Sequence, residues 1–331
     1  MKQRSAQSGF TLVELILTTT LMAIMILTVV PLFTVTSRGY TSLEVSTVLS
    51  AGTQEALSRI QTKASENKHM FGRDATGIAF LARITPYVSP APLSGSLLPV
   101  IASTGSLSPS SGAFQSTNTG NSLLFASVDK SVDVSTGGAT TRIDTNVFNY
   151  YYLAPNASLY IGNVPVRDLW EWHSIVYTDY QNINNISDAT LKKNVIKNLL
   201  AQGYTYAYDA SATSVNSAFY QLTSAGGFTS QASHNIVRYK SGKMIQLIRG
   251  ISLGSFVYSV SPNTGGSFTH KYAVPLYADA NGTFPCGFET MVVGPASLRR
   301  VFIRVVMAAK GSFKGYMAYE QVMLVAARDL W

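Results

Sequence analysis

Charge and cysteine are scarce in this chain of 331 residues. Charged residues make up 13% of it, about half the usual share, while 46% of it is hydrophobic. The single cysteine, Cys286, excludes an intrachain disulfide and a cluster of thiolate metal ligands, and we expect it to be a small buried residue. Low charge with frequent Tyr, Ser, Thr, Asn and Gly indicates a β-rich body outside the cytoplasm.

The usual signatures of enzymes and metalloproteins are also missing. The sequence contains no P-loop and no G-x-G-x-x-G motif. Residues 250–254 (GISLG) match the G-x-S-x-G elbow of hydrolases, but that elbow needs a helix after the serine, and a strand-like run follows Ser252. The four histidines lie far apart, and none has the spacing of a metal-ligand pair: His69, His173, His234 and His270. We therefore expect neither catalytic residues nor a cofactor.

One weak candidate for a metal is the turn at residues 279–282 (DANG). Asp279 and Asn281 carry oxygen ligands of the kind that Ca²⁺ prefers. No glutamate closes the coordination shell at the spacing of an EF-hand, because the next one is Glu289. A tight turn explains the same residues, so no metal site is assigned.

The formal net charge is +8, yet the basic residues are dispersed. Their densest clusters are Lys192, Lys193 and Lys197, and Arg299, Arg300 and Arg304. Because no run of five like charges occurs, solvated faces explain the clusters better than nucleic-acid binding does. A basic head that contacts DNA remains an alternative.

A single stretch of the chain is suited to a membrane. No charged residue occurs from Leu15 to Val35, and about 20 residues suffice for a helix to cross the hydrocarbon core. The stretch is too long for the core of an ordinary secretory signal. Lys2 and Arg4 precede it, so residues 1–8 are expected in the cytoplasm and the body outside. No second run approaches this length.

Glu14 lies at the start of this apolar segment. An acid in hydrocarbon is costly and indicates a function, but no cation lies within helical reach inside the span. If the chain is cut after Gly9, Phe10 carries a free α-amine about 6 Å along the helix from Glu14. The amine of the same chain or of a neighbouring subunit could pair with the carboxylate, and such a pair could fix the stagger of packed helices.

The leader, residues 9–15 (GFTLVEL) and the long apolar helix together resemble the class III signal of type IV pilins and pseudopilins. The resemblance implies cleavage by prepilin peptidase between Gly9 and Phe10, N-methylation of Phe10, and an assembly role for Glu14. Pro31 stands where many pilins carry a proline, and a kink or local melting is expected there because proline lacks an N–H. The resemblance is strong over residues 1 to about 60. An uncleaved signal anchor is the alternative.

These observations predict an α+β, pilin-like fold with four parts. A leader (1–9) is removed; a membrane-spanning or filament-core helix (10–35) continues as an amphipathic helix (36–66); and a β-rich head (67–331) lies in the periplasm or outside the cell. The continuation carries a loose apolar stripe that includes Leu43, Val48 and Ile60. One long helix, about 10–66, should therefore pack on an antiparallel sheet.

Within the head, residues 89–122 are rich in Ser, Gly, Pro and Thr and predict a long surface loop. Hairpins are expected around residues 241–243 and near Gly311, loosely similar to the sheet of J-type pseudopilins and W-type minor pilins. A helix is expected at 188–202, capped by Ser187 and ended by Gly203. Strands are expected at 123–128, 146–153, 159–164, 174–180, 204–208, 235–240, 244–250, 255–260, 271–277, 300–309 and 316–326.

Aromatic residues cluster within these predicted strands. Tyr204, Tyr206 and Tyr208 share one strand face, and three consecutive tyrosines stand at 150–152. An exposed aromatic face could bind sugar rings or another subunit. Core packing explains the same pattern and is favoured.

The sequence thus predicts a non-enzymatic subunit of a type II secretion pseudopilus or a type IV pilus. The large head favours a minor subunit, and Glu14 argues against the tip-capping K-type pseudopilins, which usually lack that acid. The resemblance implies prepilin peptidase, other pilins, an inner-membrane platform protein and an assembly ATPase as partners. Two alternatives stay open: a competence-type pseudopilin that contacts DNA, and a membrane-anchored binding protein or enzyme that uses the leader for delivery.

Overall fold

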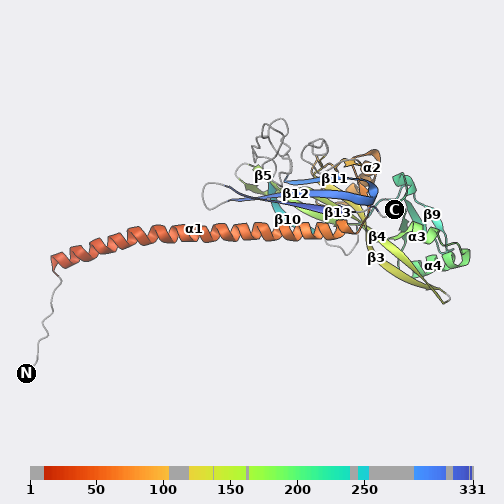
Figure 1. Ribbon diagram of the computed structural model, residues 1–331, viewed down its shortest axis with the longest axis horizontal. Helices are drawn as coiled ribbons and strands as arrows, with labels where there is room; N and C mark the ends of the chain where they lie inside the picture. Colours follow the sequence, from red (N-terminus) through yellow and green to blue (C-terminus); the bar gives the residue numbers. More distant parts are fainter. Residues whose placement is uncertain are drawn as a thin grey trace, which may run out of the picture.

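The computed structural model describes residues 11–103, 119–136, 138–161, 164–238, 245–252, 287–310, 316–327 and 329. Over these residues the protein is a long stem helix whose C-terminal half carries a β-sheet head (Figure 1). The stem is α1 (Leu12–Ser65), 54 residues and therefore about 80 Å long. The predicted α+β architecture, with one long helix packed on a largely antiparallel sheet, is confirmed.

The head contains the remaining helices and strands. Its helices are α2 (Ala75–Ile84), α3 (Tyr180–Asn184) and α4 (Ala189–Ala201), with 3₁₀ turns η1 (Thr85–Tyr87), η3 (Val215–Ser217) and η4 (Ala296–Leu298). Its strands are β1 (Asn67–Phe71), β2 (Ile101–Ala102), β3 (Ser122–Thr136), β4 (Ala139–Ile161), β5 (Val164–His173), β6 (Tyr177–Asp179), β7 (Tyr206–Tyr208), β8 (Phe219–Leu222), β9 (Phe228–Ser230), β10 (Ile245–Ser252), β11 (Phe288–Val293), β12 (Arg299–Lys310) and β13 (Tyr316–Ala327).

All the described strands belong to one sheet. Its main order is β2-β11-β12-β10-β5-β4-β6-β7-β8-β9, with β13 beside β12, and β3 between β1 and β4. Neighbours are antiparallel except for the pairs β11–β2 and β6–β7. The C-terminal hairpin is confirmed, because β12 and β13 pair along their whole length from Arg299–Ala327 to Lys310–Tyr316.

The N-terminal part of the stem is exposed, and its C-terminal part is packed into the core of the head. No side chain is buried from Leu12 to Val48, whereas the C-terminal part of α1 packs on β10, β12 and β13. The buried residues recur every three or four positions, so they form one stripe on the helix. They are Leu49, Thr53, Ala56, Leu57, Ile60 and Ala64.

The sheet is covered on both faces, which explains the consecutive tyrosines. Tyr151 belongs to the core beneath α1, with Phe125 stacked 5.9 Å away. Tyr150 and Tyr152 point to the opposite face, into the core shared with α2. Because adjacent residues of a strand face opposite sides, three tyrosines in a row can all be buried only in such a doubly covered sheet. The core interpretation of residues 150–152 is therefore confirmed.

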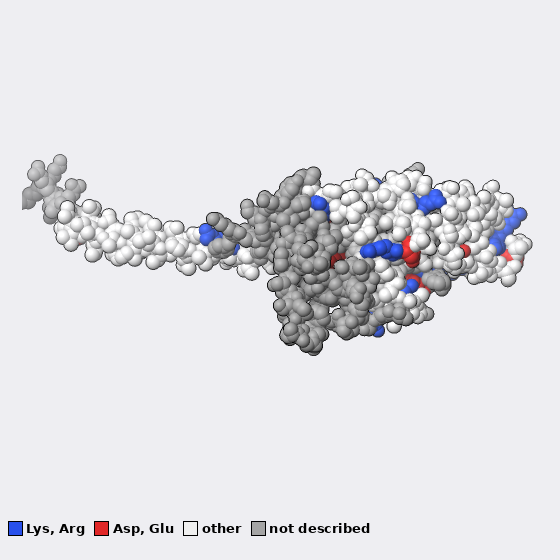
Figure 2. Space-filling view, turned by 90° about the horizontal axis from the view of Figure 1, so that it is seen from above, with Lys and Arg blue, Asp and Glu red and all other residues white. Residues whose placement is uncertain are grey.

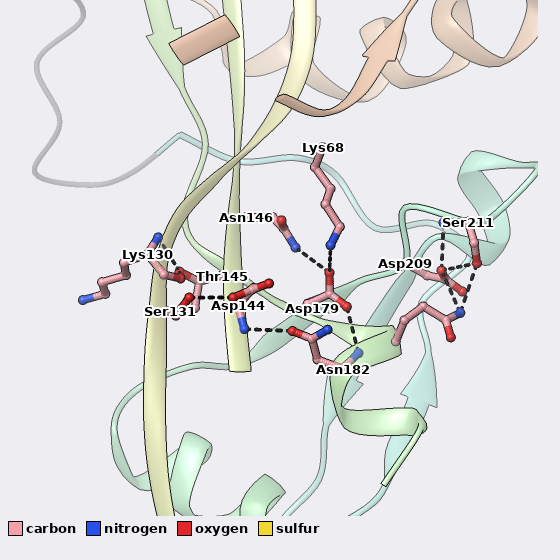
Figure 3. A network of polar contacts seen from close by, with 11 residues as sticks. Lys68, Lys130, Ser131, Asp144, Thr145, Asn146, Asp179, Asn182, Asp209 and Ser211 are labelled. Carbon is pink, nitrogen blue, oxygen red and sulfur yellow. Dashed lines mark hydrogen bonds and ion pairs between the residues drawn. The ribbon is translucent and has the colours of Figure 1, made fainter. Parts of the chain in front are cut away.

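The end of the head away from the N-terminus forms a distal lobe, which we define as residues 177–230 with the neighbouring ends of β3 and β4 (Figure 1). Its own core joins α4 to β4 through residues such as Ile143 and Leu199. Lys68, just after the stem, reaches Asp179 of the lobe at 3.0 Å, and both side chains are nearly inaccessible to water (Figure 3). This ion pair joins the lobe to β1, the strand that follows the stem.

Several local predictions need correction. The helix predicted at 188–202 is α4, but its cap is Asp188, whose carboxylate accepts from Thr190 N at 2.8 Å, and not Ser187. The hairpin around 241–243 is wrong, because β10 pairs with β5 and β12 rather than with residues 235–240. The strand predicted at 235–240 is also wrong over 235–238, where Arg238 makes only an isolated bridge to Ser174.

The remaining differences are a strand predicted too short, a helix that the sequence did not predict, and segments that lie outside the described residues. The strand predicted at 123–128 is part of the much longer β3. The strand predicted at 159–164 includes the end of β4, which stops at Ile161, and the first residue of β5, Val164. The helix α2 was not predicted. The predicted strands 255–260 and 271–277, and residues 104–118 of the predicted loop, lie outside the described residues.

A buried carboxylate fixes the stem on the head. Glu171 of β5 is 1% exposed and accepts hydrogen bonds from the Tyr151 hydroxyl at 3.0 Å and from Arg59 Nη2 of α1 at 2.9 Å. His173 Nε2 lies 2.9 Å from the same carboxylate. Burial by itself raises the pKa of Glu171, but the bonds and charges of His173 and Arg59 outweigh it and lower the pKa overall. The carboxylate is therefore charged at neutral pH.

Replacing this carboxylate should loosen the stem. In Glu171→Gln we expect the free energy of unfolding at pH 7 to fall by about 1–3 kcal/mol, because buried donors lose a charged acceptor. Arg59 is 41% exposed and contributes less, since water screens its charge. Thermal unfolding in detergent micelles measures the change, with Glu55→Gln on the exposed side of α1 as the matched control. The difference from wild type should begin to shrink as the pH falls below the ordinary carboxyl pKa, and it should be lost once the pH passes below the lowered pKa of folded Glu171, where the carboxylate is protonated. Equal losses in both variants would contradict this role.

A second titratable group, half-buried, lies in the distal part of the head. His234 Nε2 is 3.1 Å from the Tyr177 hydroxyl, and its ring packs on Tyr206 and Phe219. Burial, with a smaller contribution from Arg83, lowers the pKa of His234 from 6.5 to about 4. The unfolded chain therefore binds this proton more readily than the folded one.

Acidification should destabilise the head through this histidine. As the pH falls from about 6.5 to about 4, the stability that the neutral imidazole contributes is lost. We expect the unfolding midpoint of the wild type to drop more steeply over this range than that of His234→Gln. A pH series of thermal unfolding curves for the two proteins checks this, and parallel curves would refute it.

Candidate functional site

The N-terminal end of α1 is the candidate site. Thr11 is the N-cap of the helix, and its hydroxyl accepts a hydrogen bond from Glu14 N at 3.4 Å. In return, Glu14 Oε2 accepts from Thr11 N and from Thr11 Oγ1, both at 2.9 Å. This reciprocal arrangement is a capping box, which satisfies amide groups that a helix start otherwise leaves open.

The capping box gives the Glu14 carboxylate a partner within its own helix. The acid is held at the helix start by its own backbone, where the positive end of the helix dipole also favours a negative charge. Thr11 is thus a residue of the candidate site that the sequence interpretation missed. Its signal was available, because residues 11–14 (TLVE) follow the pattern Thr-x-x-Glu before an apolar run.

The predicted cleavage site adjoins this box. Gly9 and Phe10 lie outside the described residues, so the structure does not place them. The described chain begins at Thr11, which is directly bonded to Phe10. A free amine on Phe10 would therefore arise one residue from the atoms that already hold the Glu14 carboxylate.

The stretch after the site is apolar and bare. Among the described residues, α1 is the one helix long and apolar enough to cross a membrane, and its most apolar window has no buried residue. Figure 2 shows the N-terminal part of the stem without basic or acidic atoms on the face drawn. Its polar side chains are threonines whose hydroxyls donate to carbonyls four residues earlier, which satisfies them without water. They are Thr18, Thr19, Thr20, Thr28 and Thr34.

Pro31 lies inside this stretch. It supplies no N–H to the carbonyl of Leu27, four residues earlier. The helix nevertheless runs through Pro31 without interruption, so the local melting that we expected there is absent. Figure 1 shows a gentle curvature in the N-terminal half of α1.

The other candidates do not form a site in the described part of the chain. Ser252 is the last described residue of β10, paired with Val166, and the residues after it, which a hydrolase elbow would need as a helix, lie outside the described part of the chain. No group of three or more His, Cys, Asp or Glu side chains could hold a metal among the residues that the structure describes. The calcium candidates Asp279 and Asn281, together with Cys286 and His270, lie outside those residues.

Comparison with known proteins identifies the N-terminal segment. Residues 4–30 match the family model of the prokaryotic N-terminal methylation motif. No curated protein and no solved structure matches the chain. The matched range contains the predicted cleavage site, Glu14 and most of the apolar stretch, and the helix that follows carries a pilin-like α+β head. The chain therefore carries the N-terminal methylation motif found in type IV pilins and pseudopilins, and its long apolar helix followed by an α+β head resembles the architecture of that family.

Proposed function

We propose that the protein is a minor, non-enzymatic subunit of a type IV pilus or a type II secretion pseudopilus. The observation that carries this proposal is the division of α1: its N-terminal half is apolar and bare, and its C-terminal half belongs to the head core. A bare apolar helix needs either lipid or other helices around it. The stem can therefore pass from a membrane to a bundle of like stems without any change in the head.

The maturation that we propose follows from the N-terminal motif. Prepilin peptidase removes residues 1–9 and methylates Phe10, while residues 10–35 hold the protein in the inner membrane with the head, residues 67–331, on the far side. A platform protein and an assembly ATPase then move the subunit into the filament. The size of the head favours a minor subunit, because major subunits of the family tend to be small.

Glu14 has a defined task in this proposal. Its carboxylate is held by Thr11, and both described hydrogen bonds go to Oε2. The amine of Phe10 on an adjacent subunit can bind the same carboxylate, and this ion pair sets the axial stagger between neighbouring stems. In a medium of low dielectric constant, removing one partner of such a pair is strongly destabilising, because the other charge is left uncompensated.

Processing is tested first. Mass spectrometry of the protein purified from its host should find a chain that begins with N-methylated Phe10. In Gly9→Leu, the peptidase should no longer accept the site, and the leader should remain on the membrane-bound protein. A wild-type chain that still begins with its leader would refute the maturation step.

Assembly is tested at Glu14. For Glu14→Ala we expect incorporation into sheared filaments to fall by at least about tenfold, because the Phe10 amine loses its partner in a low-dielectric bundle. Membrane insertion and cleavage should remain. The matched control is Thr11→Val, which removes the capping hydroxyl but keeps the carboxylate, and its incorporation should fall far less. Unchanged incorporation of Glu14→Ala would refute the charge-pairing mechanism.

A further inference from the structure

A cleft of about 460 Å³ opens on the head where the sheet meets the distal lobe. Its walls come from β1, the start of α2, the segment around β2, the loop after β7 and the start of β12. It thus joins segments that are far apart in the sequence. Its polar lining includes His69, Asp74, Ser211, Thr213 and Arg299. A cleft of this size is typical of sites for small molecules.

The polar walls of the cleft are held in place. Asp74 caps α2 by accepting from Gly77 N at 2.7 Å, and a Cβ on Gly77 would clash with the carbonyl oxygen of Gly72 on the neighbouring turn. Ser211 donates to Asp209 Oδ1 at 2.6 Å, and Gln181 contacts the same oxygen at 3.1 Å (Figure 3). A ligand would therefore meet preformed partners, which lowers the entropic cost of binding.

The charge of the cleft disfavours anions. Among the described residues of the lining, Arg299 is the one cationic side chain. Its Nε is paired with Asp329 at 3.1 Å, and its Nη1 donates to Gly294 O at 2.7 Å. Burial lowers the pKa of His69, although the charge of Asp329 opposes the shift, so the imidazole is neutral at pH 7. Because Asp329 balances the charge of Arg299, the carboxylate of Asp74, which is exposed at the rim, leaves the cleft slightly negative.

The remaining lining mixes hydroxyl groups with small apolar surfaces. Ser103, Ser211, Thr76 and Thr213 supply hydroxyls. Ile101, Met70, Ala210 and Ala212 supply apolar contact. A sugar ring presents the complementary pattern, because its hydroxyls both donate and accept while its C–H faces are apolar. The carboxylate of Asp74 can accept from sugar hydroxyls, and the lining residues that the structure describes include no lysine to attract phosphate or sulfate.

The cleft also lies far from the membrane end of the stem. His69 belongs to β1, which begins two residues after α1 ends at Ser65. The helix between Val35 and Ser65 rises about 45 Å. The cleft is therefore near the outer end of the stem, away from the bare helical surface through which subunits pack.

We propose that this cleft binds an uncharged saccharide of one or two rings. Asp74, Thr213 and Ser211 bind hydroxyls of the sugar at the rim, and Ile101 and Ala212 contact its apolar face. The site gives the head a ligand-binding activity that is separate from assembly, because none of these residues lies on the stem.

Saturation-transfer NMR on the full-length chain in micelles tests the proposal. The detergent should have an amine-oxide head group, because maltoside and glucoside detergents would compete for the cleft. The probes are a panel of neutral monosaccharides and disaccharides, with sialic acid and glucuronic acid as anionic comparisons. We expect transfer to some neutral sugars and none to the anionic ones.

Three variants locate the binding. Thr213→Val removes a rim hydroxyl, Asp74→Asn keeps the helix cap but removes the charge, and Ala212→Phe fills the cleft. Each should weaken binding about fivefold or more, the loss expected of one or two hydrogen bonds or of blocked volume. Thr229→Val, on exposed β9 outside the cleft, should bind like the wild type.

The outcomes that would overturn the proposal are distinct. They are no transfer to any neutral sugar, transfer only to the anionic sugars, or neutral binding that all three cleft variants leave unchanged. The measurement needs only the folded protein, so its result does not depend on whether the chain assembles into a filament.

Discussion

The packing of the C-terminal half of α1 on the sheet is the interaction on which the rest of the structure depends. Most helical stability in proteins comes from tertiary packing, and the buried stripe from Leu49 to Ala64 attaches the stem to the head. The Glu171 carboxylate adds direction to this apolar contact, because Arg59 of the helix and Tyr151 of the sheet must both reach it. Apolar packing alone would tolerate more rotation of the stem.

This attachment leaves the other half of α1 without a protein partner. The exposed stretch is apolar, and its threonines bond back to the helix, so lipid or like helices can surround it equally well. Glu14 is the exception, and the capping box with Thr11 holds it at the very start of the helix. The acid therefore lies at the end of the bare surface rather than in its middle.

The head extends beyond the stem into the distal lobe, and the joint between them is polar. The Lys68–Asp179 pair ties the lobe to the strand that follows α1, and the hydrogen bonds of Asp209 hold the loop after β7 (Figure 3). Removing either partner would leave a buried charge uncompensated, so the pair resists displacement of the lobe from the sheet. The cleft that we propose to bind sugar opens at the same joint, so its shape depends on the angle of the lobe.

The sequence by itself determined the stem, because the pattern of leader, glycine, aromatic residue, acid and apolar run is local and needs no tertiary partner. The periodicity of the sequence also determined the C-terminal hairpin and α4. Only the tertiary structure decided which strands flank β10, because pairing between distant segments leaves no local pattern. The same holds for Glu171 and for the cleft, whose residues come from segments as far apart as 69 and 299. The burial of three consecutive tyrosines likewise depends on the tertiary structure, because both faces of the sheet are covered.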